Sequence, residues 1–129
     1  MNSKYDKDPF YMDIDKLAFI GDAVFELFIR KSIVNNFSSL SIGDINNIKV
    51  KNVCCEAQAE FFKLLRPFLD EKEIAIYKRG RNSKVGNAPS RVSPYTYKVA
   101  TGVEVLFGYL YLSNREDRII DLLGHLNIE

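Results

Sequence analysis

Two carboxylates stand in stretches of sequence where no neighbouring side chain neutralises them. Asp22 lies in the apolar run LAFIGDAVFELFIRKSIV, residues 17–34, and Glu104 is the only charged residue of residues 99–112. A carboxylate in apolar surroundings is costly unless it is paired or bound to a metal. If both segments are helices that cross, the carboxylates converge on an oxygen-rich site suited to Mg²⁺ or Mn²⁺. The alternative is that each acid pairs with a basic side chain from residues 78–98, and the pattern alone leaves both open.

Asp22 belongs to a stripe of ionic side chains. Asp15, Asp22, Glu26 and Arg30 follow one another at steps of seven, four and four, which places them on one face of a helix. Glu26 can pair with Arg30 one turn later. The residue one turn after Asp22 is Glu26, another acid, and two carboxylates at this spacing repel each other. The stripe therefore predicts a cation near Asp22, either a metal ion or a basic side chain from elsewhere in the chain.

The strongest charge asymmetry of the chain lies between Glu73 and Glu104. This segment contains six basic residues and no acidic one, although the net charge of the whole chain is only +1. Arg79, Arg81 and Lys84 cluster there beside glycines and an asparagine. Contact with phosphates is the commonest use of such a cluster, and the plainer alternative is that these side chains are only solvated. The asymmetry favours a polyanionic partner.

The elements that must position these residues are all expected to be helices. No alternating strand pattern with hairpin turns occurs, and apolar residues recur at helical spacing. The expected helices cover residues 14–34, 41–65, 70–80, 95–112 and 116–126. The first is apolar nearly all round, which is typical of a buried helix. Residues 1–13 are expected to be a loosely packed lead-in, and the segment after the third helix a long loop of the kind that often carries function.

Four residues mark expected helix boundaries and one marks a helix contact. Asp70 is the expected N-cap of the third helix and Gly80 its terminating residue. Ser113 or Asn114 is expected to cap the last helix. Gly108 follows Glu104 by one turn, and its missing side chain would let another helix approach closely at that point.

Composition limits the class of protein. With 129 residues, 47% apolar and 27% charged, the chain fits one domain over residues 1–129. No window approaches a membrane span, and the N-terminus is too polar and acidic for a signal peptide, so we expect a cytoplasmic protein with no membrane partner. Cys54 and Cys55 are adjacent in sequence and are expected to be buried, reduced thiols rather than a disulfide or a zinc site.

Two motifs of the chain resemble sequence motifs of proteins with the ribonuclease III fold, and in particular those of the Mini-ribonuclease III family. LAFIGDAVFELFIR is similar to the signature helix of that fold, which contains a Gly-Asp-Ala triplet. KRGRNSKVGN followed by YTYKVATGVEVLFGYLYL resembles the basic loop and second acidic helix of the Mini family. The similarity extends over about residues 15–113. It implies an all-α helical bundle, the ribonuclease III endonuclease-domain fold, which forms a homodimer and lacks the double-stranded-RNA-binding domain of longer enzymes.

The resemblance also implies an activity and a set of site residues. The activity is divalent-metal-dependent endoribonuclease cleavage of double-stranded RNA, with precursor large-subunit ribosomal RNA as the usual bacterial substrate. Asp22 and Glu104 match the acids that bind the metal, Mg²⁺ or Mn²⁺, and are the expected catalytic residues. Asp15, Glu26 and Thr101 are expected to support them. The residues expected to contact RNA are Arg79, Arg81, Asn82, Lys84 and Arg91.

Two positions depart from full-length ribonuclease III. Ala18 and Thr101 stand where that enzyme has further acids, and the Mini family is similarly reduced there. The number of metal ions is therefore left open. The competing hypotheses are a non-catalytic RNA-binding or ribosome-associated module on the same fold, and a helical interaction protein with no role on RNA.

Overall fold

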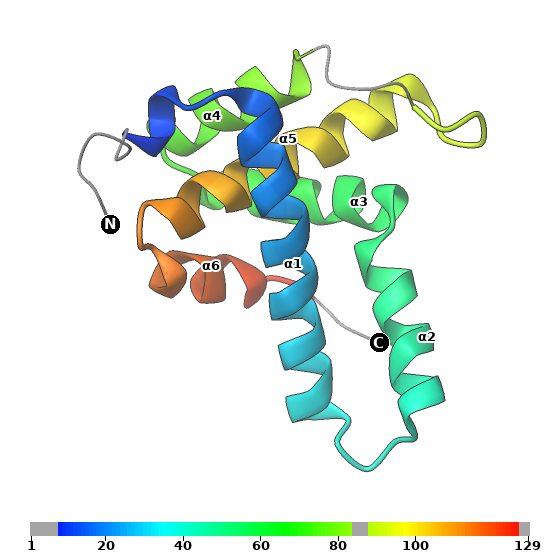
Figure 1. Cartoon of the computed structure of the whole chain (residues 1–129). Helices are drawn as coiled ribbons and strands as arrows, with labels where there is room; N and C mark the ends of the chain where they lie inside the picture. The colour runs from blue at the N-terminus through cyan, green and yellow to red at the C-terminus, as the bar shows by residue number, and fades with distance from the viewer. Residues whose placement is uncertain (1–7, 84–87, 127–129) are drawn as a thin grey trace.

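The computed structural model describes residues 8–83 and 88–126, which form helices joined by mostly short connections (Figure 1). In chain order these are η2 (Pro9–Tyr11), α1 (Ile14–Asn36), α2 (Ile42–Val53), α3 (Cys55–Leu65), η3 (Arg66–Phe68), α4 (Glu71–Arg81), α5 (Pro94–Leu112) and α6 (Glu116–Leu123), where η marks a 3₁₀ turn. No strand occurs in the described residues, and the all-α prediction is confirmed. None of the helices in these residues is long and apolar enough to cross a membrane.

The crossing of α1 and α5 is the centre of the fold, and glycines set how closely the two helices approach (Figure 1). A Cβ atom on Gly21 of α1 would overlap the backbone carbonyl oxygen of Glu104, and one on Gly108 of α5 would overlap that of Leu17. The close approach expected at Gly108 is confirmed, and Gly21 is its counterpart on α1. Because Gly21 precedes Asp22, the helices touch at the two acids.

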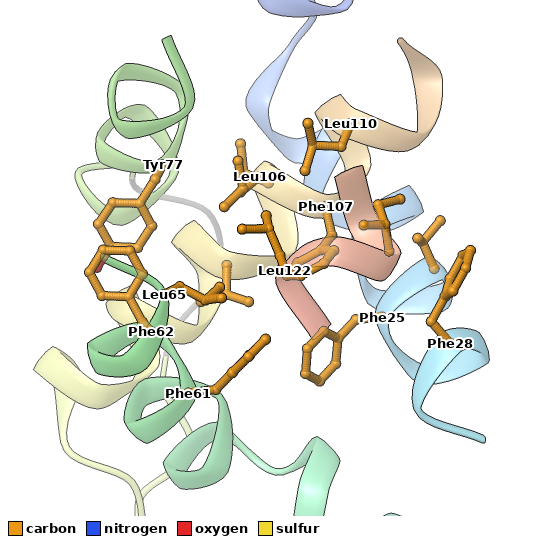
Figure 2. Close-up of a cluster of buried hydrophobic side chains, with 14 of the residues drawn as sticks. Phe25, Phe28, Phe61, Phe62, Leu65, Tyr77, Leu106, Phe107, Leu110 and Leu122 are labelled. Atoms are coloured by element: carbon orange, nitrogen blue, oxygen red, sulfur yellow. The ribbon is translucent and has the colours of Figure 1, made fainter. Parts of the chain in front are cut away.

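An aromatic cluster next to this crossing fixes α3 against α1 and α5 (Figure 2). The ring centroid of Phe107 lies 5.3 Å from that of Phe25 and 6.2 Å from that of Phe61. All three rings are at most 1% exposed. Burial of each such side chain contributes about 1.5–3 kcal/mol. The cluster therefore determines which part of α3 lies over which part of α5.

The expectation that the first helix is buried nearly all round is wrong. Phe19, Leu27 and Val34 of α1 are 79%, 58% and 52% exposed. They lie on the side of α1 that points away from α5, and no other described element covers them. This apolar face is a feature of the surface rather than of the core.

The single helix expected over residues 41–65 is also wrong, because the chain breaks at Cys54. The expected burial of both thiols is wrong as well, since Cys54 is exposed at this break and Cys55 is half-buried. Cys54 has φ −70° and ψ 162°, an extended conformation, and serves as both the C-cap of α2 and the N-cap of α3. The break lets α2 run alongside α1 while α3 turns onto α5 (Figure 1). Ser41 caps α2 as a typical N-cap, since its hydroxyl oxygen accepts a hydrogen bond from the Asp44 backbone N–H at 3.1 Å.

The third predicted helix, α4, begins as expected and ends later. Asp70 and Glu73 form a capping box, each side chain accepting a hydrogen bond from the other's backbone N–H. Gly80 does not terminate the helix, which continues to Arg81. Gly80 is buried instead, and a Cβ there would lie 2.8 Å from the Cβ of Val105 on α5. Its small size is used for helix packing, not for a C-cap.

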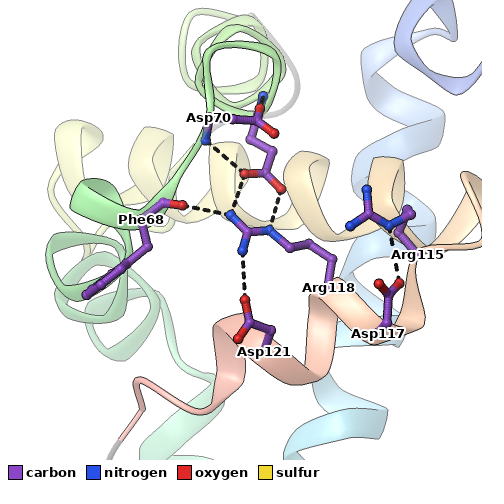
Figure 3. A network of polar contacts seen from close by, with 7 residues as sticks. Phe68, Asp70, Arg115, Asp117, Arg118 and Asp121 are labelled. Carbon is purple, nitrogen blue, oxygen red and sulfur yellow. Dashed lines mark hydrogen bonds and ion pairs between the residues drawn. The ribbon is translucent and has the colours of Figure 1, made fainter.

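The last helix, α6, is shorter than expected and is held by a buried ion pair (Figure 3). Arg118 donates two hydrogen bonds of 2.8 Å to the carboxylate of Glu73, and it also bonds the Phe68 carbonyl oxygen and Asp121. The expected cap at Ser113 or Asn114 is wrong, because α6 starts after Arg115. Asn114 instead takes a left-handed φ of 59° in the turn, a conformation that Asn tolerates better than most residues.

Candidate active site

The structure brings Asp22 and Glu104 together at the α1–α5 crossing. Burial of Glu104, followed by the charge of Asp22 and a hydrogen bond between the two side chains, raises the pKa of the Glu104 carboxyl to about 8. Neither acid forms an ion pair with a basic side chain in the described residues. The expected convergence of the two acids is therefore confirmed. Pairing with a base from residues 78–98 does not occur in the part of that segment that the structure describes.

The two acids fit a divalent cation. Two neighbouring carboxyl groups without a basic partner favour a bound cation, and their hard oxygen donors suit Mg²⁺ or Mn²⁺. Within the described ranges, no third His, Cys, Asp or Glu joins them to form a larger cluster. Mg²⁺ is commonly held by one or two carboxylates together with waters and substrate phosphates. A pair of acids therefore suffices to hold one ion.

The supporting residues expected from the sequence occupy separate places around this pair. Glu26 forms an ion pair of 2.5 Å with Arg30, as its spacing predicts, and both line a hollow of about 340 Å³ that also contains Asp22. Asp15 is exposed, and its carboxylate accepts a hydrogen bond from the Lys16 backbone N–H. Thr101 is 6% exposed, and its hydroxyl donates to the Tyr97 carbonyl oxygen at 3.0 Å. Of these, Glu26 is the one that shares a cavity with Asp22.

The basic residues of α4 differ in what their side chains contact. The Arg79 guanidinium donates hydrogen bonds to the backbone carbonyl oxygens of Phe10 and Met12 in the lead-in. Its carbon also lies 5.5 Å from the centroid of the Phe10 ring. Arg81 lies near the end of α4, where its Nε donates to the Asn82 side chain at 3.1 Å. Arg79 thus ties the lead-in to α4, whereas Arg81 and Asn82 lie where the basic loop begins.

The remaining two basic positions lie along the connection between α4 and α5. Arg91 is exposed shortly before α5. Lys84 lies outside the described residues. In the described part of the lead-in, Phe10 and Met12 lie against the core, whereas Tyr11 is 73% exposed.

Comparison with known proteins shows the family of this chain. The family model described as "Ribonuclease III domain" matches residues 15–115. A protein named Mini-ribonuclease 3 from Clostridium tetani is 36% identical to this chain over 107 residues, which cover 83% of the chain and 71% of that protein. A protein of the same name from Thermoanaerobacter sp. is 42% identical over 107 residues, which cover 83% of the chain and 75% of that protein. The chain belongs to the Mini-ribonuclease III family.

A solved structure agrees with this assignment at the level of the fold. The crystal structure of a Fusobacterium nucleatum protein aligns with a TM-score of 0.79 and 30% identity, covering 92% of this chain and 95% of that one. The ribonuclease III fold expected from the sequence is confirmed. Membership of the family places the chain among RNA-cleaving nucleases.

Two residues at the start of α3, close to the α1–α5 crossing, were missed by sequence reasoning. Burial, and next the charge of Glu104, raises the pKa of the Cys55 thiol, so this side chain lies within electrostatic reach of the site. Gln58 follows one turn later on the same helix and is 4% exposed. Both were assigned to the middle of an unbroken helix. The break at Cys54, which turns them toward α5, carries no proline or glycine that would have indicated it.

Proposed function

We propose that this chain is a divalent-metal-dependent endoribonuclease that cleaves double-stranded RNA. The observation that carries the proposal is the coupled acid pair, in which burial and Asp22 raise the pKa of Glu104 to about 8. An acid that is largely covered beside another acid is costly to maintain without a cation, and strongly perturbed acids are concentrated at functional sites. The glycine contacts at the helix crossing hold this pair in place.

Each acid has a distinct task in the proposed reaction. Asp22 is exposed, while Glu104 is largely covered. Together they would hold Mg²⁺, with Mn²⁺ as a substitute, and the bound ion would supply the charge that polarises a phosphodiester and favours attack by water. Because burial and the charge of Asp22 raise the pKa of Glu104, its carboxyl would have to lose its proton to bind the cation. No side-chain nucleophile is required.

Glu26, Asp15 and Thr101 are assigned supporting roles. Glu26 is held one turn from Asp22 by its ion pair with Arg30, and so adds negative potential to the same hollow. Asp15 extends the acidic stripe by two turns. Thr101 is bonded to its own helix backbone, which keeps that turn of α5 rigid beside Glu104.

RNA is proposed to lie across the acids and the basic connection after α4. Arg81, Asn82, Lys84 and Arg91 would contact phosphates, since A-form RNA is recognised by its backbone and shape more than by its bases. Arg79, the fifth residue predicted to contact RNA, already bonds two carbonyl oxygens of the lead-in. We therefore assign it mainly to holding that segment, with a contribution to the positive potential.

A homodimer would supply the longer RNA-binding surface that one chain of this size lacks. The exposed apolar face of α1, formed by Phe19, Leu27 and Val34, supports this proposal because such a face is typical of a protein interface. Two copies would present two acid pairs, one for each RNA strand. We propose that residues 1–129 form one catalytic domain that acts in the cytoplasm on precursor large-subunit ribosomal RNA.

One assay tests the activity. Purified protein is incubated with a long duplex RNA, with Mg²⁺ or with chelator, and RNA retention and fragment size are measured together. Cleavage should require the cation, and Asp22→Asn and Glu104→Gln should abolish cutting while RNA retention persists. Glu60→Gln is the matched control, because Glu60 is an exposed acid paired with Lys63. Normal cutting by either active-site variant would refute the assignment.

A non-catalytic RNA-binding or ribosome-associated module is the second candidate. The observation that favours it is the small donor set, because Ala18 has no donor atom and the Thr101 hydroxyl is bonded to its own helix. Retention of RNA without fragments at any Mg²⁺ concentration would support this second function.

A further inference from the structure

Gln58 of α3 has a buried oxygen atom that no group of the protein satisfies. The side chain is 4% exposed, and its Nε2 donates a hydrogen bond of 3.0 Å to the Val53 carbonyl oxygen. That carbonyl can only accept, so it fixes which end of the amide is nitrogen. The Oε1 atom is the one buried side-chain nitrogen or oxygen in residues 8–83 and 88–126 that lacks a partner. Such an atom needs an explanation, since nearly all buried polar groups are hydrogen-bonded.

The position of Gln58 is set by contacts on either side of it along α3. One turn earlier, Cys55 lies within electrostatic reach of Glu104. One turn later, Phe61 packs on Phe107, which follows Glu104 by three residues on α5. Gln58 lies between these two contacts along α3 and is buried, so it is on the side of α3 that faces α5, close to the α1–α5 crossing that carries the acid pair.

The bond to the Val53 carbonyl accounts for the amide nitrogen of Gln58 but not for its oxygen. A buried acceptor without a partner costs free energy. A hydrogen-bond donor that is not part of the described protein, such as a water molecule, would satisfy Oε1.

We propose that Gln58 is a positioning residue for the divalent cation held by Asp22 and Glu104, and that its Oε1 accepts a hydrogen bond from a water of the hydration shell of that cation. This inference rests on the proposed function and adds a residue of α3 to a site otherwise built by α1 and α5. Outer groups of this kind orient the ligands of a metal, and their loss typically weakens metal binding by about 10- to 100-fold. Gln58 does not touch the reacting phosphate.

The test measures cation affinity rather than cleavage. Mn²⁺ binding to the full chain is followed by calorimetry, and Mg²⁺ binding by the rise in melting temperature with Mg²⁺ concentration. Gln58→Leu and Gln58→Met both remove the acceptor and should weaken Mn²⁺ affinity at least about tenfold. Gln58→Glu keeps an acceptor oxygen but loses the donor to the Val53 carbonyl, and should retain wild-type affinity or exceed it.

The chain offers a matched control in Asn52 of α2. Asn52 is 9% exposed, and its Nδ2 donates to the Ile48 carbonyl oxygen at 2.8 Å, so Asn52→Leu also removes a buried amide that bonds the local backbone. Its cation affinity should equal that of the wild type. Unchanged affinity in both Gln58→Leu and Gln58→Met, or an equal loss in Gln58→Glu, would overturn the positioning role. If the wild type itself binds neither Mn²⁺ nor Mg²⁺, the proposed metal site fails together with this inference.

Discussion

Replacing Glu104 by Gln should remove a pH dependence of folding stability that the acid pair creates. Burial and the neighbouring Asp22 raise the pKa of Glu104 from 4.5 to about 8 in the folded protein. The folded state therefore binds this proton more tightly than the unfolded state does. The stabilisation is fully present below about pH 4.5 and is lost as the pH rises through about 8.

The size of the effect follows from the difference between the two pKa values. Between about pH 4.5 and about pH 8, the free energy of unfolding should fall by about 1.4 kcal/mol per pH unit, or by up to about 5 kcal/mol in total. A domain is stable by only about 5–15 kcal/mol, so this loss is large. The Glu104→Gln variant has no ionisable group at this position, and its stability should not fall from this cause.

Urea unfolding followed by circular dichroism measures this difference. Wild type and Glu104→Gln are compared in chelator from about pH 5 to about pH 9. The protein concentration is the same throughout, so that self-association contributes equally to every measurement. Glu60→Gln serves as the control and should follow the wild type, since its exposed ion pair with Lys63 is worth little. Added Mg²⁺ should stabilise the wild type most at high pH. Parallel curves for wild type and Glu104→Gln would refute the coupling of the two acids.

Three further outcomes follow from the structure. Arg118→Ala should lower the free energy of unfolding by about 3 kcal/mol, because it leaves the buried Glu73 carboxylate without its partner; urea unfolding measures this. Gly108→Ala should lower it by at least about 3 kcal/mol, because a Cβ would overlap backbone of α1 and push the helices apart. Arg81→Ala should weaken binding to any duplex RNA and reduce the salt slope of log affinity by about 0.9, if one phosphate contact is lost.

Each of these outcomes has a control within the chain. Arg115→Ala breaks an exposed ion pair with Asp117 and should change stability by less than about 1 kcal/mol. Gly43→Ala places a Cβ on α2 at an ordinary van der Waals distance, 3.9 Å from the Ser41 Oγ, and should stabilise by about 0.5–1 kcal/mol. Arg79→Ala should leave the salt slope nearly unchanged but make the lead-in easier to cleave by protease. Equal effects of a variant and its control would contradict the corresponding assignment.

The acid pair could be predicted from the sequence because each acid is conspicuous in its own helix. Asp22 has apolar or acidic neighbours at every helical spacing, and Glu104 is alone in an apolar segment. Gly108 indicated the point on the Glu104 helix at which another helix could approach closely. These signals are local and need only the period of a helix. The environment of Arg79 is not local, because its partners Phe10 and Met12 are 69 and 67 residues away in sequence.

The break between α2 and α3 could not be predicted for the same reason. Residues 41–65 contain no proline, and their apolar spacing is compatible with one helix. The extended conformation of Cys54 costs a turn of helix, and packing of Phe61 against Phe25 and Phe107 compensates for it. Tertiary contacts here override local preference. The error mattered for function, because it hid the approach of Cys55 and Gln58 to the acids.

The glycines of the crossing and the acids of the site form one arrangement. A side chain at Gly21 or Gly108 would separate α1 from α5, and the same separation would part Asp22 from Glu104. The close contact therefore maintains a repulsion that destabilises the protein without a cation, since it keeps two carboxylates together. A fold selected for stability alone would place a larger apolar residue at either glycine or replace Glu104. The divalent cation proposed for this site has the charge to offset that repulsion when it binds.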